Sequence, residues 1–196
     1  MPKQTLMTTW FRILLLVIPL SGNIRAQEKF EKESRIGEKE VPTQALLFLA
    51  PLNLSKVKWY KEEGLNGTSI EVKFKAGKAR YSVEFDTLGR VEDIEIEADW
   101  DDLASGLRDS IAASLNNHCI QHKVIKVQRH FKGDEAELFS IIRDGKNIPS
   151  LTHQYELIVR CNQEHQVDQF EYLFSDTGQP VSRSKIVFRN SSHLEY

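Results

Sequence analysis

Two similar strand-turn-strand segments occur in the two halves of this chain. Residues 81–89 read YSVEFDTLG, and residues 170–178 read FEYLFSDTG. In each segment an alternating aromatic and apolar stretch ends on Phe, and an Asp-containing turn closes on Gly. Alternation with a period of two predicts strands, and a repeated unit indicates a scaffold built by duplication. Such scaffolds present surfaces more often than they hold catalytic groups.

Residues 1–26 are predicted to be a secretory signal peptide. Lys3 and Arg12 provide a basic start, ILLLVIPL follows at 13–20, and Ala26 suits cleavage before Gln27. The apolar run is much shorter than the roughly 20 residues that span a bilayer. We therefore expect a periplasmic or secreted protein with no membrane anchor after cleavage.

Cleavage would change the charge balance of the chain. It removes Lys3, Arg12 and Arg25, so 26 basic residues fall to 23 against 28 acidic ones, a formal net charge of about −5. An acidic balance argues against a nucleic-acid or anionic-membrane partner. About 170 residues remain, enough for one sizeable core or two small fused ones.

The exported part divides into a leader, two units and a tail. Residues 27–40, QEKFEKESRIGEKE, are almost all charged and predict a flexible leader. We expect unit 1 at 41–98, unit 2 at 99–190 with an insertion at 132–153, and a tail at 191–196.

Each unit is predicted to contain one helix followed by four strands. In unit 1, an apolar helix from Val41-Pro42 ends at Pro51, and strands follow at 56–61, 70–74, 81–85 and 91–97, the last irregular at Glu92-Asp93. In unit 2, Asp101 and Asp102 are expected to cap a helix with an apolar residue at every fourth position. Strands are expected at 122–131, 155–161, 170–174 and 181–188, and the insertion is expected to form a short helix or hairpin. The fold class is therefore α+β, with tandem helix-plus-four-strand units forming one antiparallel sheet and helices packed on one face.

This order of elements resembles the secreted PepSY-like proteins, whose fold is compared with that of the beta-lactamase inhibitor protein. The resemblance rests on Val41-Pro42, on APL at 50–52, on KVKWY at 56–60 and on the segment at 81–89. It implies an exported, non-enzymatic domain common in Bacteroidetes-type bacteria, with no established activity to transfer.

Cys119 and Cys161 are the two cysteines of the chain. In an oxidising compartment they could form a disulfide that joins a helix to the sheet. Two separate small core residues are an equal alternative, because the sequence does not give their distance.

Metal and catalytic signals are weak. His118, Cys119, His122 and His130 could attract zinc, but paired ligands from two separate segments are lacking. The acidic run at 92–102 lacks the ligand spacing of a calcium loop. No nucleophile motif, phosphate loop or HExxH pattern is present. We expect no metal, no cofactor and no enzyme activity.

The sheet face away from the helices gives the sharpest functional hint. In unit 1 this face is expected to be fully polar, whereas in unit 2 it would contain Val124, Ile158, Leu173 and Val187. Apolar residues on an otherwise wet face often mark a binding surface. Alternatively, the insertion at 132–153 folds over them.

The sequence thus predicts an exported, non-catalytic protein whose open sheet face binds a macromolecule. We expect this partner to be another protein. One alternative is an inhibitor of an extracytoplasmic enzyme. Another is an envelope sensor of small molecules or metals, with a pocket lined by Trp59, Tyr60 and histidines.

Overall fold

A computed structural model describes residues 27–29, 31–65, 67–145, 148–164 and 166–187. The predicted signal peptide at 1–26 and the tail at 191–196 lie outside the described residues. Within the described ranges, none of the helices has the length and apolar content needed to cross a membrane.

The described chain forms a single sheet of ten strands. The strands are β1 (Gln27–Lys29), β2 (Glu31–Ile36), β3 (Lys58–Gly64), β4 (Gly67–Ala76), β5 (Ala79–Phe85), β6 (Val91–Ala98), β7 (Gln121–Lys132), β8 (Thr152–Asn162), β9 (Val167–Ser175) and β10 (Pro180–Ile186). They lie in the order β1-β10-β9-β8-β7-β6-β5-β4-β3-β2. The nine strands β2 to β10 pair antiparallel, and β1 adds to β10 in parallel. β5 and β6 shift register at Glu92, which confirms the expected irregularity.

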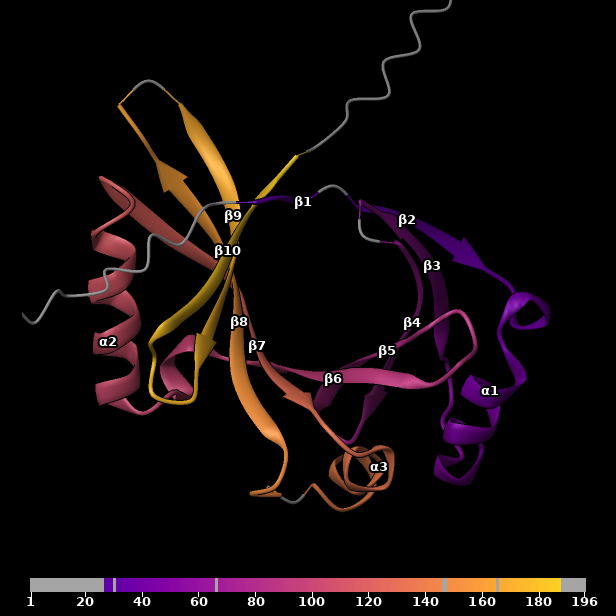
Figure 1. Ribbon diagram of the computed structural model, residues 1–196. Coiled ribbons are helices and arrows are strands. Elements are labelled where there is room, and N and C mark those ends of the chain that lie inside the picture. Colours follow the sequence, from indigo (N-terminus) through magenta and orange to yellow (C-terminus); the bar gives the residue numbers. More distant parts are fainter. Residues whose placement is uncertain (1–26, 30, 66, 146–147, 165, 188–196) are drawn as a thin grey trace, which may run out of the picture.

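Three α-helices of the described chain cover the outer side of this curved sheet (Figure 1). They are α1 (Thr43–Leu49), α2 (Ser105–Asn116) and α3 (Glu135–Asp144). Short 3-10 turns occur at Glu38–Glu40, Ala50–Leu52 and Trp100–Asp102. The predicted α+β class, with one antiparallel sheet and helices on one face, is confirmed.

At every second position along the strands, apolar side chains point from the sheet toward the helices. Under α1 and α3 the buried set includes the strand residues Ile70, Val72, Phe74, Tyr81, Val83 and Phe85. Under α2 it includes Leu157, Val159, Phe170, Tyr172 and Phe174. These are the residues that the alternation predicts to face inward.

The insertion at 132–153 packs on this same helix side. α3 buries Leu138, Ile141 and Ile142 in the cluster that contains Phe48 of α1, and the Phe139 and Phe48 rings meet edge to face at 5.5 Å. The alternative that the insertion covers the opposite sheet face is therefore wrong. The side chain of Asp134 caps α3 by accepting from the backbone N–H groups of Ala136 and Glu137.

The expectation that Asp101 and Asp102 cap the second helix is also wrong. Both lie in the 3-10 turn before α2, which begins at Ser105 after Ala104. The side chain of Asp101 instead pairs with Arg108 at 3.0 Å. The 3-10 turn is followed by Leu103, which is buried in the same cluster as Leu107 of α2, and the α-helix begins only after it.

The expected flexible leader at 27–40 forms two strands instead. β1 adds to β10 at one edge of the sheet, and β2 adds to β3 at the other (Figure 1). We call β1 and β2 together the leader strap. The Cα atoms of Lys29 and Glu31 can be at most about 7–8 Å apart, since one residue separates them, so the two sheet edges approach each other there.

Charge pairing explains why this highly charged segment is ordered. Lys29 Nζ lies 2.6 Å from Glu171 Oε2 of β9, and Glu33 Oε2 lies 3.0 Å from Lys73 Nζ of β4. A charged composition predicts disorder only when the charges have no fixed partners. These partners lie far away in the sequence.

The two repeated turns each press against a helix. Gly89 has φ +85°, and a Cβ there would lie 2.8 Å from the Ala45 backbone N of α1. Gly178 has φ +80°, and a Cβ there would lie 2.9 Å from Ser110 Cβ of α2. Ser110 Oγ also donates to the Gly178 carbonyl at 3.1 Å. Both glycines are therefore needed for conformation and for close approach.

Replacing either glycine by Ala tests this contact. Gly77 provides a matched control, since it has φ +60° but nothing within 4 Å of a built Cβ. We expect Gly89→Ala and Gly178→Ala to lower the free energy of unfolding by about 1–3 kcal/mol more than Gly77→Ala, because overpacking adds to backbone strain. Urea denaturation measures the three variants. Equal losses would show that the turns do not press on the helices.

A disulfide joins Cys119 and Cys161, with an S–S distance of 2.06 Å. It links the segment after α2 to β8, and both cysteines are buried in the cluster under α2. Of the two alternatives left open by the sequence, the structure has the bridge.

Removing the bridge should destabilise the chain. The residues are 42 apart in sequence, and a loop of this length is worth about 4 kcal/mol in the chain-entropy model. We expect the double variant Cys119→Ala/Cys161→Ala to lose about that free energy in denaturant unfolding. Wild-type protein treated with reductant should lose a similar free energy of unfolding. Unchanged stability in both samples would contradict a stabilising role of the disulfide.

Candidate functional site

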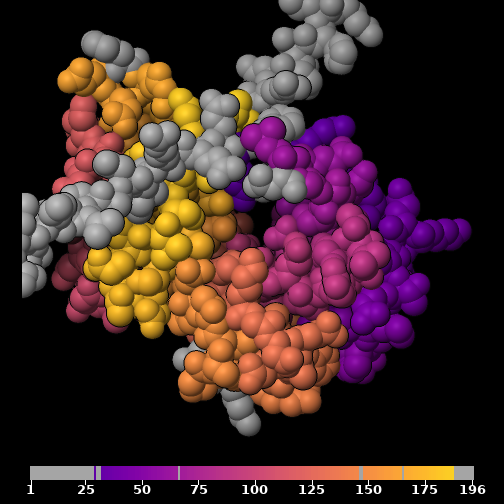
Figure 2. All heavy atoms as spheres, viewed as in Figure 1, coloured from indigo at the N-terminus to yellow at the C-terminus, as the bar shows by residue number. Residues whose placement is uncertain are grey.

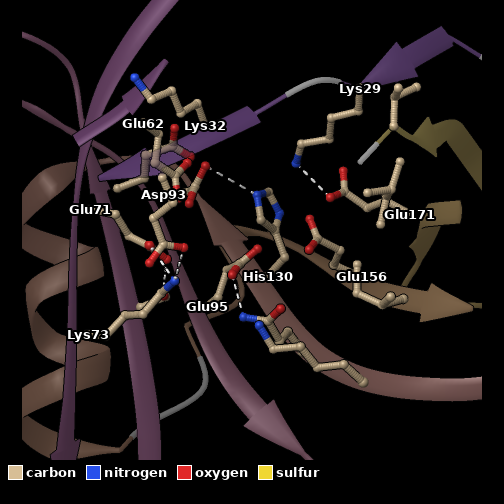
Figure 3. Close-up of a pocket in the computed structure, with 18 residues that line it drawn as sticks. Lys29, Lys32, Glu62, Glu71, Lys73, Asp93, Glu95, His130, Glu156 and Glu171 are labelled. Carbon is tan, nitrogen blue, oxygen red and sulfur yellow. Dashed lines mark hydrogen bonds and ion pairs between the residues drawn. The ribbon is translucent and has the colours of Figure 1, made fainter. Parts of the chain in front are cut away.

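The concave side of the sheet, opposite the helices, encloses a chamber of about 790 Å³. Its walls come from the leader strap and from strands of both halves of the sheet, and Figure 3 shows the lining side chains converging from these elements. Figure 2 shows the surface hollowed between the yellow C-terminal strand and the magenta strands. We refer to this space as the chamber.

Carboxyl groups dominate the lining of the chamber. Eight acids face four lysines, with His130 between them, so the formal charge is −4 with His130 neutral. The acids are Glu33, Glu62, Glu71, Glu84, Asp93, Glu95, Glu156 and Glu171. The lysines are Lys29, Lys32, Lys73 and Lys126.

At one end of the chamber, Lys73 holds the leader strap to the sheet. Its Nζ lies 2.7 Å from Glu71 Oε2 and 3.0 Å from Glu33 Oε2, and it stands 4.9 Å from the centre of the Tyr60 ring. The Ser82 hydroxyl donates to the other Glu71 oxygen. Burial opposes the charge on Lys73, but the pairs with Glu71 and Glu33 hold its pKa above the usual value.

His130 stands in the middle of the chamber and is only 7% exposed. Its Nε2 faces Asp93 Oδ2 at 3.4 Å, while its buried Nδ1 has no hydrogen-bond partner among the described residues. Burial lowers the pKa of His130, but the Asp93 contact outweighs it, so the pKa is raised overall. An unpaired buried nitrogen costs free energy unless a ligand or water meets it.

Three carboxyl groups near His130 hold protons unusually well. Burial, followed by the charge of Asp93, raises the pKa of Glu84 and of Glu95 to about 7. Burial and the charges of Glu95 and Glu171 raise the pKa of Glu156 well above its usual range. The Gln128 side-chain N–H donates to Glu95 but brings no charge. This part of the chamber therefore keeps protons on its carboxyl groups near neutral pH, and a bound cation would favour their release.

Two of the four predicted apolar binding residues line the chamber. Ile158 of β8 and Val187, which follows β10, both contribute to its wall beside Ile186. Leu173 lies on the same face as Glu171 but is half-buried outside the lining.

The prediction for Val124 is wrong. Its side chain packs against the cluster under α2, on the helix side of the sheet. β7 shifts register against β8 between Val124 and Lys126, and this bulge reverses the alternation of the strand. No local residue pattern marks the bulge.

The sensor pocket expected around Trp59 and Tyr60 does not form. Trp59 is 5% exposed and belongs to the core under α1, whereas Tyr60 points the other way and meets Lys73. Of the histidines, His130 lines the chamber.

The weak metal signals also separate in space. Cys119 is in the disulfide, so it offers no thiolate to zinc. In the acidic run, Asp93 and Glu95 enter the chamber while Glu97 pairs with Arg80 at 2.9 Å. Over the described ranges, one trio of potential ligands converges within 4.8 Å: Glu33, Glu62 and Glu71.

Sequence reasoning missed the chamber rather than its residues. Glu71, Lys73 and Glu84 were expected on a polar outer face, and they do lie on the face away from the helices. That face is concave, so charged side chains that were expected to be solvated lie close to one another instead. The signal in the sequence was the set of acids at alternating positions of β6, Asp93, Glu95 and Glu97.

Comparisons with known proteins find similar structures but no similar sequences. No family model and no curated protein matches the chain. A DUF2874 family protein of Bacteroides uniformis aligns with a TM-score of 0.51 at 14% identity, over 74% of this chain and 89% of that one. A Bacteroides eggerthii protein, provisionally described as periplasmic, aligns with a TM-score of 0.51 at 11% identity, over 74% and 88%. A BLIP-like protein of Bacteroides fragilis aligns with a TM-score of 0.47 at 18% identity, over 78% and 92%. The chain therefore shares its fold with DUF2874 proteins of Bacteroides, while membership of the PepSY family stays a prediction.

Proposed function

We propose that this chain is an exported, non-enzymatic binding protein whose binding site is the chamber. The observation that carries the proposal is the space of about 790 Å³ in which crowded carboxyl groups surround the unpaired nitrogen of His130. The volume lies in the range of about 300–1,000 Å³ that ligand pockets commonly have. Unlike an average pocket, this one is lined mostly by charged groups, which favours a charged ligand whose apolar part rests on a small apolar wall. Ile158, Ile186 and Val187 supply such a wall.

The leader strap changes the kind of partner that this face accepts. The sequence predicts an open sheet face that engages a macromolecule, but the strap connects the two edges of the sheet around the chamber. A protein partner, including an enzyme that this chain would inhibit, would have to insert a projecting side chain or segment into the chamber. The envelope sensor of the sequence analysis needs only a small ligand, which the chamber accepts as it stands.

The proposal includes two points of organisation. Export to the periplasm or beyond agrees with the predicted signal peptide. Two tandem PepSY-like units would explain why the turns at Gly89 and Gly178 press on α1 and α2 in the same way.

Filling the chamber tests the binding function. Ile158→Trp places an indole in the wall, and Leu173→Trp is the matched control on the same face outside the lining. Both variants and the wild type are incubated with a small-molecule extract of bacterial envelopes and examined by native mass spectrometry. We expect a bound adduct on wild type and on Leu173→Trp, with about tenfold or greater loss of affinity in Ile158→Trp. No adduct on any of the three proteins would contradict the function.

The raised pKa values predict how stability depends on pH. The pKa of Glu84 and of Glu95 rises from 4.5 to about 7 in the folded chain, so protons stabilise the fold. This contribution is full below about pH 4.5 and is lost as pH rises through about 7. We expect the free energy of unfolding to fall between pH 5 and pH 8 by on the order of 2 kcal/mol for each group, and the melting temperature to fall with it.

Glu95→Gln should make the melting temperature depend less on pH and should raise it at pH 8, because the neutral amide needs no proton to lose its charge. Glu97→Gln, on the same strand outside the lining, should leave the wild-type profile unchanged. A wild-type profile that rises over this range would contradict the assignment.

A further inference from the structure

We propose that the ligand of the chamber is an aliphatic primary ammonium, held by Glu95, Glu156 and His130 with its methylene groups against Ile158. The ammonium can belong to a free diamine or polyamine, or to a lysine side chain of a polypeptide. This inference rests on the proposed binding function and names the chemistry of the ligand.

The three polar groups form a row across neighbouring strands. Glu95 of β6 pairs directly with His130 of β7, and Glu156 of β8 pairs with Gln128, which lies on the same face of β7 as His130. Strands lie about 4.8 Å apart, so the carboxyl groups of β6 and β8 flank the β7 side chains from both sides. Figure 3 shows Glu95, Glu156 and His130 directed into one space. An ammonium has three N–H donors, and this row offers three acceptors.

His130 supplies an observation independent of the acidic cluster. Its Nε2 faces the Asp93 carboxylate, so the neutral imidazole carries its hydrogen there and leaves a lone pair on Nδ1. That buried lone pair has no partner among the described residues. A protonated imidazole would instead donate to an anion, but the surrounding carboxylates repel one. A bound ammonium both donates to Nδ1 and favours the neutral ring.

The apolar wall selects the rest of the ligand. Ile158 lies two residues from Glu156 on the same face of β8, and Ile186 and Val187 also line the chamber. Methylene groups pack on such side chains while a charged end reaches polar groups. A ligand with an aliphatic stem and an ammonium end therefore fits both surfaces.

At the other end of the chamber, the chain itself shows how carboxyl groups of this lining bind an ammonium. Lys73 Nζ sits between Glu71 and Glu33 at 2.7 and 3.0 Å with the Tyr60 ring beside it. The same lysine argues against a divalent metal as the ligand, because it contacts two of the three carboxylates in the trio that converges within 4.8 Å. A space of about 790 Å³ also exceeds what one ion fills.

Calorimetric titration at low ionic strength tests the ligand class, since charge contacts are screened least there. The probes are cadaverine, the peptide Gly-Lys-Gly and the uncharged peptide Gly-norleucine-Gly, both N-acetylated and C-amidated so that no terminal charge remains, glutarate and calcium. We expect cadaverine or Gly-Lys-Gly to bind, and the other three not to bind. Tighter binding of cadaverine would identify a free amine as the source, and tighter binding of the peptide would identify a lysine side chain.

Variants then locate the bound ammonium. Glu156→Gln should weaken amine binding by about tenfold, since a charge-assisted hydrogen bond is lost, and Glu97→Gln should not. Glu156→Gln replaces a carboxyl group that burial keeps protonated by an uncharged amide of similar shape, so we expect it to fold, and its melting curve verifies this.

Binding of glutarate, calcium or the norleucine peptide in place of the amines would overturn the inference. If that binding disappears in Ile158→Trp, the chamber remains a binding site and only the ligand class is wrong. If no probe binds, the ligand class is also overturned, and the adduct experiment on envelope extract decides the binding function separately.

Discussion

The curvature of one continuous sheet is the constraint on which the rest of this structure depends. Helices cover the convex side, so alternate residues of each strand form the core and all the others converge on the concave side. On a flat sheet those polar side chains would face water. On the curved sheet they enclose a chamber in which carboxyl groups desolvate and repel one another, which raises the pKa of Glu84, Glu95 and Glu156.

The leader strap links stability to access. An exposed sheet edge offers unpaired backbone groups, and β1 and β2 satisfy one edge each, at β10 and β3. The same segment lines the chamber with Lys29 and Glu33, which pair with Glu171 and Lys73.

The two halves share architecture but contribute different chemistry. Each places a glycine turn against its helix, and both supply acids to the chamber, but only the second half adds His130 and the apolar side chain of Ile158. The disulfide belongs to the second half and α3 fills the core of the first.

The sequence by itself determined the α+β class, most strand positions and which residues face the helices, because alternation and turn residues act over short distances. It also placed Ile158 and Val187 on the correct face. Tertiary structure alone decided the leader, since pairing at both sheet edges outweighs a charged composition, and it decided Val124, since a bulge in β7 reverses the side chains beyond it. The chamber too is a tertiary property. Curvature sums small twists over many strands, and no local pattern of residues encodes that sum.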